Sequence, residues 1–189
     1  MQHFSDFYAL YLQKIKLCFM KTFLFLSLLG ISLFAMESCK KSTDNSCSYP
    51  VSNIVAPISE QQNLQDSLTA HGIQATMAPS GFFYNITAAG SGASATSLCS
   101  TVAVFYRGGF FNGLGFDSTG TGSPAIFQLG QVIAGWQKAL PLIAKSGQIT
   151  LYIPPSLGYG PDDVKDTSGK VVIPGNSNLV FQVILVDVQ

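Results

Sequence analysis

Charge and histidine are both scarce in this chain of 189 residues. Only 11% of the residues are charged, against about 25% in a typical soluble domain. Ten basic residues balance ten acidic ones, which argues against a strongly basic nucleic-acid-binding protein. The two histidines are His3 and His71. A Ser-His-Asp or Cys-His site in the second half is therefore excluded, and so is a histidine-rich metal site.

Nucleotide-binding motifs are also missing from the sequence. It contains no Walker-type phosphate loop. The run 120–125 mimics a glycine-rich dinucleotide fingerprint, but Pro124 and the strand-like pattern around Phe127 replace the helix that this motif requires. We interpret the run as a turn. The sequence therefore predicts neither a metal nor a cofactor.

The N-terminus has the pattern of an export signal. Lys14, Lys16 and Lys21 precede a charge-free run at 23–36. That run is too short to span a bilayer comfortably, but it suits the core of a signal peptide. Residues 1–38 are therefore predicted to be a signal peptide. Because the first 19 residues are unusual for such a signal, Met20 is an alternative start.

Cys39 directly follows this segment and resembles the lipidated cysteine of a bacterial lipobox. The chain would be cut just before Cys39 and anchored by lipid to the cell envelope, at the periplasmic face of the outer membrane. Surface exposure is left open. Met36 and Glu37 depart from the usual lipobox, so a plain signal peptide with a free or paired Cys39 is the alternative. Residues 39–57 are predicted to be the lipidated cysteine and a polar linker.

The four cysteines divide by their place in the chain. Cys18 would leave with the signal peptide and Cys39 would carry the lipid. Cys47 and Cys99 then form an even pair in an oxidising compartment. A disulfide between them and two unpaired small apolar side chains are equally compatible with the sequence.

A lead-in helix is predicted at residues 59–71. Leu64 and Leu68 fall on one face, and Ser59 and Gln62 have the spacing of a capping box. The two-leucine face is thin, so we expect this helix to pack on the main domain rather than to fold alone.

The second half of the chain, residues 101–189, is rich in strand patterns. One helical period occurs at 132–144, and Pro141 should shorten it. The closing strand, 178–188, is apolar on both faces and is predicted to be central. The fold class is therefore α+β, with an antiparallel sheet wrapped around one short helix and an N-terminal lead-in helix. The remaining predicted elements are strands at 81–87, 101–107, 126–129 and 148–153 and a hairpin at 110–117, so residues 58–100 supply the lead-in helix and one strand.

Seven short motifs follow one another in residues 101–189. Their order and spacing resemble those of the FKBP-type peptidyl-prolyl cis-trans isomerases. One such motif is weak evidence, but the ordered series is not expected by chance. The upstream helix and strand resemble the lead-in of lipid-anchored members from Bacteroidota, some of them tied to gliding motility. The motifs are VFYRG (104–108), GLGFDS (113–118), FQLG (127–130), VIAGW with ALP (132–141), LYIPP (151–155), LGYG (157–160), and IP (173–174) with LVF (179–181).

The resemblance implies an enzyme that rotates X–Pro peptide bonds and assists the folding of exported envelope proteins. Its partners would be proline-containing polypeptides, macrolide immunosuppressant-type ligands and, through the lipid, a membrane; nucleic acid is not among them. Two alternatives stay open: a module that binds proline-containing segments with negligible turnover, and a chaperone in an envelope complex. The segment 161–171 is longer and more charged than in minimal members and would overhang the site.

The resemblance also implies roles for individual residues. Trp136 is the pocket floor, Tyr159 donates its hydroxyl to a substrate carbonyl, and the backbone N–H of Ile133 binds the neighbouring carbonyl. Asp117 lies at the rim and holds Tyr106. Taken singly, each of these residues is by default a core or turn residue. The implied catalytic set is Tyr106, Phe116, Asp117, Trp136, Tyr159 and Phe181, and the implied substrate-binding set is Val132, Ile133, Ile173 and Phe127.

Overall fold

The computed structural model describes residues 47–120 and 122–189. The predicted signal peptide 1–38, with Met20, and the predicted lipidation site Cys39 lie outside this part. Within it, no helix is long and apolar enough to cross a membrane. The elements are α2 (Ile58–Ala70), β1 (Thr76–Met77), β2 (Phe83–Ala88), β3 (Thr101–Gly109), β4 (Gly115–Ser118), β5 (Ala125–Gln128), α3 (Ala134–Ala139), β6 (Gln148–Ile153), β7 (Val164–Lys165), β8 (Val171–Ile173) and β9 (Leu179–Val188).

Seven strands form one antiparallel sheet in the order β1-β2-β6-β9-β3-β4, and β5 also pairs with β3. β9 lies between β6 and β3, which confirms that the closing strand is central. The first residues of β3 pair with β5 and the last pair with β4, so the chain between β4 and β5 leaves the sheet. β2 pairs with β6, and the lead-in segment therefore belongs to the same sheet.

The central strand is buried on one face only. Leu179, Phe181, Val183 and Leu185 of β9 are buried, whereas Ile184 on the other face is 41% exposed. The second face is apolar in sequence but only partly covered, since Val180 packs on the cluster around Leu64 and Leu68 whereas Ile184 stays exposed. The buried face is the one that carries the main core and the cavity described below.

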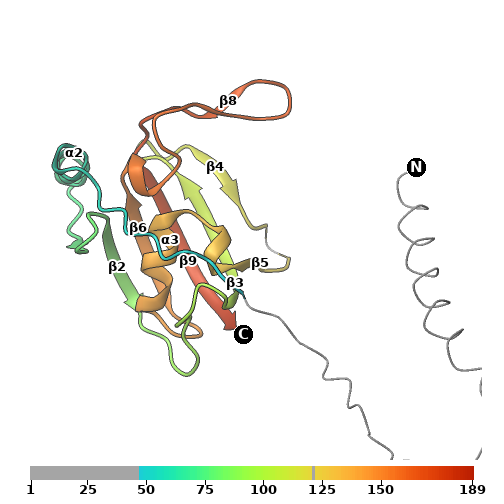
Figure 1. The fold of residues 1–189 in the computed structure, drawn as a ribbon. Coiled ribbons are helices and arrows are strands. Elements are labelled where there is room, and N and C mark those ends of the chain that lie inside the picture. Colours follow the sequence, from blue (N-terminus) through green and yellow to red (C-terminus); the bar gives the residue numbers. More distant parts are fainter. Residues whose placement is uncertain (1–46, 121) are drawn as a thin grey trace, which may run out of the picture. The chain divides into compact units, whose positions relative to one another are not determined.

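Helix α3 packs against the buried face of the sheet (Figure 1). It has six residues and continues as a 3₁₀ turn at Leu140–Leu142, so Pro141 shortens the helix as predicted. Gly135 allows close approach to the sheet, because a Cβ there would lie 2.7 Å from the Ile153 side chain. The antiparallel sheet with one short helix against it confirms the predicted fold class.

Helix α2 begins one residue before the predicted start. Its N-cap is Pro57, whose carbonyl accepts the backbone N–H groups of Glu60 and Gln61, both at 3.0 Å. The predicted capping box of Ser59 and Gln62 is wrong, because Pro57 already starts the helix and no side chain caps it. The fixed φ of proline suits this position.

The apolar face of α2 packs as predicted. Leu64 and Leu68 are completely buried against Phe83 and Tyr152. Tyr152 follows Leu151 on β6, and successive strand residues point to opposite faces of a sheet. Because Leu151 belongs to the main core, α2 lies on the opposite face of the sheet from α3.

The described part of the predicted linker, residues 47–57, is here named the strap. It contains no helix or strand and most of its residues are exposed, but it is held to the domain at several separate positions. Cys47 is joined to Cys99 by a disulfide with a Cα–Cα distance of 5.7 Å. Lys138 of α3 donates to the carbonyl of Ser52 at 2.6 Å, and Ala56 is buried. In Figure 1 the strap, drawn in cyan, crosses the α3 side of the sheet and leads into α2.

Candidate functional site

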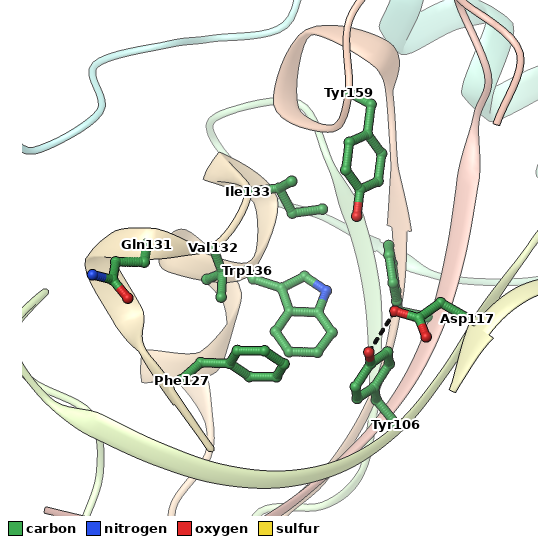
Figure 2. A pocket seen from close by; sticks show the side chains of 9 residues that line it. Tyr106, Asp117, Phe127, Gln131, Val132, Ile133, Trp136 and Tyr159 are labelled. Atoms are coloured by element: carbon green, nitrogen blue, oxygen red, sulfur yellow. Dashed lines mark hydrogen bonds between the residues drawn. The ribbon is translucent and has the colours of Figure 1, made fainter. Parts of the chain in front are cut away.

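A cavity of about 250 Å³ opens between α3, the buried face of the sheet and the loop that carries Tyr159. Figure 2 shows the side chains that line it. Most of them are apolar or aromatic, and they come from five separate stretches of the second half of the chain. The lining residues are Tyr106, Asp117, Phe127, Gln131, Val132, Ile133, Trp136, Tyr159 and Phe181.

Trp136 forms the floor of the cavity. It is 4% exposed, and three rings meet it nearly edge-on: Tyr106 and Phe181 with centroids at 5.3 Å and Phe127 at 6.1 Å. Such contacts fix the indole in place. Among the described residues its Nε1–H has no hydrogen-bond acceptor. A buried donor of this kind favours a ligand or water in the cavity that supplies the missing acceptor.

Tyr106 and Asp117 form the polar edge of the cavity. The Tyr106 hydroxyl donates to Asp117 Oδ2 at 2.5 Å, across the β3–β4 pair (Figure 2). Burial raises the pKa of Tyr106, and the bond to the Asp117 carboxylate raises that pKa further. The backbone of Tyr106 is held as well, because its N–H donates to Oγ1 of Thr119 at 2.9 Å. The hydroxyl of Tyr106 is therefore protonated and already engaged.

Tyr159 stands on the opposite side, on the loop after the 3₁₀ turn Pro155–Leu157. Gly160, at φ 80°, donates its N–H to the Pro155 carbonyl at 2.9 Å and closes this loop. Tyr159 is 43% exposed, and its hydroxyl makes no hydrogen bond to another described residue. In Figure 2 this hydroxyl points between Ile133 and Asp117. Burial, and then the Asp117 charge, raise the pKa of Tyr159, so it is a free donor at neutral pH.

A second unengaged donor comes from the start of α3. Ile133 is the N-cap of this helix and its side chain lines the cavity. The backbone N–H of an N-cap residue has no partner inside its own helix. Within the described part of the chain, the Ile133 N–H donates to no other group. The cavity thus combines aromatic walls with unengaged N–H and O–H donors.

Most of the residues implied by sequence are brought together here, although Phe116 and Ile173 do not line the cavity. Phe116 contacts two of the lining residues, with its ring centroid 5.6 Å from that of Phe181 and 6.4 Å from that of Tyr159. Ile173 is buried in the core. Sequence reasoning missed Gln131, whose one signal was its place directly before Val132 and Ile133 in the same turn.

The charged segment after Tyr159 does not enter the cavity. It forms a hairpin of β7 and β8, which is drawn away from the sheet in Figure 1. No residue of 161–171 is among those that line the cavity. The family resemblance implies that this segment overhangs the site, but the segment forms no part of the cavity walls.

The chemistry available in the cavity is limited. Within residues 47–120 and 122–189, no group of three or more His, Cys, Asp or Glu side chains could hold a metal ion. Asp117 is the one carboxylate among the lining residues, and the Tyr106 hydroxyl occupies it. The site is therefore suited to binding an apolar ring and an amide rather than to nucleophilic attack.

Comparison with known proteins agrees with this geometry. The family model described as "FKBP-type peptidyl-prolyl cis-trans isomerase" matches residues 92–186, half of the chain. The chain belongs to the FKBP-type peptidyl-prolyl cis-trans isomerases. The predicted family resemblance is thereby confirmed at this level.

Individual FKBP-type relatives share part of their length with this chain. A probable FKBP-type isomerase of Haemophilus influenzae is 42% identical over 120 residues, covering 63% of this chain and 47% of its own. The outer membrane protein MIP of Legionella longbeachae is 39% identical over 112 residues, covering 59% and 46%. The crystal structure of FkpA from Escherichia coli superimposes with a TM-score of 0.58 at 35% identity, covering 69% of this chain and 60% of that one. The chain thus spans less than half the length of these two curated relatives.

Proposed function

We propose that the protein is a peptidyl-prolyl cis-trans isomerase whose active site is the cavity above Trp136. The observation that carries this proposal is an aromatic cavity whose Tyr159 hydroxyl and Ile133 N–H have no hydrogen-bond partner among the residues that the structure describes. Membership of the FKBP-type family supports it. The substrates would be proline-containing polypeptides, because a prolyl ring is an apolar group that such walls accept.

The reaction needs no nucleophile. Rotation about an X–Pro bond crosses a barrier of about 18–20 kcal/mol, because the planar amide loses its resonance in the twisted state. An apolar cavity removes the water that stabilises the planar, charge-separated amide. Fixed donors then favour the twisted state. Lowering the barrier by about 5.5 kcal/mol would accelerate the rotation roughly 10⁴-fold.

Each residue near the cavity has a place in this mechanism. Trp136 supports the prolyl ring from below. Tyr159 donates to a substrate carbonyl, and the Ile133 N–H donates to the next carbonyl along. Asp117 fixes Tyr106 as a wall. Phe127, Val132 and Phe181 complete the walls. Phe116 supports them through its ring contacts with Phe181 and Tyr159, and Ile173 supports them from the core.

Two other functions would use the same cavity. A binding module would hold proline-containing segments without turning them over, and a chaperone would hold unfolded chains in an envelope complex. Nothing in the lining residues favours either over catalysis, since the cavity keeps its aromatic floor and its donors. Macrolide immunosuppressant-type compounds would compete for the cavity under all three functions.

The deciding experiment is a cis-to-trans assay of short X–Pro peptides with the purified full-length protein. Tyr159→Phe removes only the free hydroxyl, and kcat/KM should fall by about two- to tenfold, the usual value of one hydrogen bond. Tyr84→Phe is the matched control, because Tyr84 lies on β2 and does not line the cavity. A folded wild-type protein without activity across several X residues would overturn the isomerase and leave a binding module.

The place of action is a separate proposal. We infer that the protein is exported and anchored to the bacterial envelope by lipid on Cys39, after removal of residues 1–38. The apolar run 23–36, the cysteine that follows it and similarity to a protein named outer membrane protein MIP support this. Replacing Cys39 with Ser should move the protein from the membrane fraction to the soluble fraction. An unchanged membrane fraction would count against the lipid anchor and against the likeness to Bacteroidota lipoproteins.

A further inference from the structure

The strap contacts the outer side of one cavity wall. The Tyr49 hydroxyl donates to Gln128 Oε1 at 2.5 Å and accepts from Gln131 Nε2 at 2.8 Å. These two glutamines border the short turn between Phe127 and Val132, which both line the cavity. In Figure 2 the Gln131 amide points away from Trp136, towards the outside of this wall.

The Tyr49 ring also fills the space beside this turn. A Cβ on Gly130 would lie only 2.2 Å from the Tyr49 ring, so the ring rests directly on the glycine backbone. Gly130 itself donates its N–H to the Leu98 carbonyl at 2.7 Å. The turn is thus held between the strap on one side and the segment before β3 on the other.

A disulfide on one side and a hydrogen bond on the other hold Tyr49 in this position. The disulfide between Cys47 and Cys99 fixes the chain two residues before it. The bond from Lys138 to the Ser52 carbonyl fixes the chain three residues after it. Since Lys138 lies on α3 together with Trp136, the strap is tied to the element that carries the cavity floor.

The chain then reaches the opposite wall through α2. Glu60, in the first turn of this helix, accepts the backbone N–H of Ser156 at 3.0 Å. Ser156 belongs to the 3₁₀ turn that precedes Tyr159. The buried faces of Leu64 and Leu68 hold α2 on the sheet, so Glu60 is a fixed acceptor for this turn.

We propose that Tyr49 and Glu60 are positioning residues that hold two opposite walls of the cavity above Trp136. Tyr49 sets the Phe127–Val132 turn from outside, and Glu60 sets the loop that carries Tyr159. Both precede residue 92, where the match to the family model begins. The lead-in is therefore a working part of the site in this chain. The assignment of a catalytic effect to these walls rests on the proposed isomerase function.

The test compares variants that remove only these contacts, in the full-length protein. Tyr49→Phe keeps the ring and loses both hydrogen bonds. Glu60→Ala loses the acceptor for Ser156, whereas Glu60→Gln keeps one and should restore the wild-type behaviour. Asn178→Ala is the control, because its side chain donates to Asn63 and Ser67 of α2 but does not reach the cavity.

Two readouts separate positioning from general stability. Tyr49→Phe and Glu60→Ala should each raise KM for an X–Pro peptide by about two- to tenfold, with kcat less affected, while Asn178→Ala leaves KM unchanged. Trp136 is the one tryptophan of the chain, so its emission and acrylamide quenching report on the cavity floor. Quenching should increase in Tyr49→Phe.

The outcomes distinguish the two proposals. If Tyr49→Phe and Glu60→Ala lower the melting temperature as Asn178→Ala does, but leave KM and Trp136 quenching unchanged, the positioning role is overturned. If the wild type has no isomerase activity, the proposed function fails by itself. Increased quenching in Tyr49→Phe would then still support the contact with the wall, and unchanged quenching would overturn it.

Discussion

The cavity and the β7–β8 hairpin that follows Tyr159 differ in what fixes their shape. The cavity is built from rings that meet in the interior, with Trp136 in edge contact with three others. The hairpin tip is exposed, and Asp166 organises it alone, accepting from the Ser168 N–H, the Ser168 hydroxyl and the Lys170 N–H. A change in the cavity must therefore disturb several neighbours, whereas a change at the hairpin tip stays local.

The base of the hairpin, unlike its tip, is tied to the rest of the domain. At its base Asp163 accepts the Gly175 N–H at 2.9 Å, and Ile173 is buried. Close by, Asn176 donates its N–H to the carbonyl of Gly160, next to Tyr159. The base is thus linked to the Tyr159 loop, and the tip is not. This explains how a chain can lengthen the hairpin while keeping its cavity.

The largest effect is expected from Trp136→Ala. Removing a buried aromatic side chain typically costs about 3–5 kcal/mol of stability, and here it also removes the cavity floor. Urea unfolding followed by circular dichroism should show this loss, and isomerase activity should disappear. Trp136→Phe keeps an aromatic floor and should retain both the fold and part of the activity. A Trp136→Ala protein of unchanged activity would mean that the cavity is not the active site.

Elements and site residues can be predicted from the sequence where a local periodicity or an ordered series of motifs marks them. Strand 148–153 was predicted with its observed ends, because its alternation stops at Pro154. The helix shortened by Pro141 and the central closing strand were also predicted. The ordered motifs brought Tyr106, Trp136 and Tyr159 to one cavity although they lie far apart in the chain.

Sequence patterns do not predict those features of the site that depend only on tertiary contacts. The order of the motifs does not tell which side chains face the cavity, and Phe116 and Ile173 of the implied set are not among the residues that line it. Tyr49 sits in a stretch without helical or strand periodicity, and nothing in that stretch indicates its bonds to Gln128 and Gln131. For this reason the sequence alone predicts a linker where the structure has the strap.

A smaller effect is expected from pH, because burial protects the tyrosines of the cavity. The pKa values of Tyr106 and Tyr159 both lie above the ordinary value of about 10. Both hydroxyls should therefore stay protonated, and kcat/KM should be flat from pH 7 to about 10. Above that pH, tyrosines ionise in the unfolded chain first. The stability that the neutral hydroxyls contribute is full below about pH 10 and is lost as pH rises towards the folded pKa values.

Measuring kcat/KM and the absorbance at 295 nm over the same pH range tests this prediction. A fall in kcat/KM with a midpoint below pH 10, matched by early ionisation, would show that Tyr159 is not shielded. Asp117→Asn provides the control. It should let Tyr106 ionise at lower pH than in the wild type, yet still late, because burial is the larger cause of the raised pKa.

The smallest effect is expected at the hairpin tip. Asp166→Ala removes the carboxylate that organises the turn, so proteolysis between residues 165 and 170 should become faster. Because no residue of 161–171 lines the cavity, kcat/KM for a short X–Pro peptide should stay within about twofold of the wild type. Asp163→Ala, at the base, should reduce kcat/KM more, since the base is linked to the Tyr159 loop. If the tip variant lowered kcat/KM as strongly as Tyr159→Phe, the hairpin would contact substrate and the contrast with the cavity would fail.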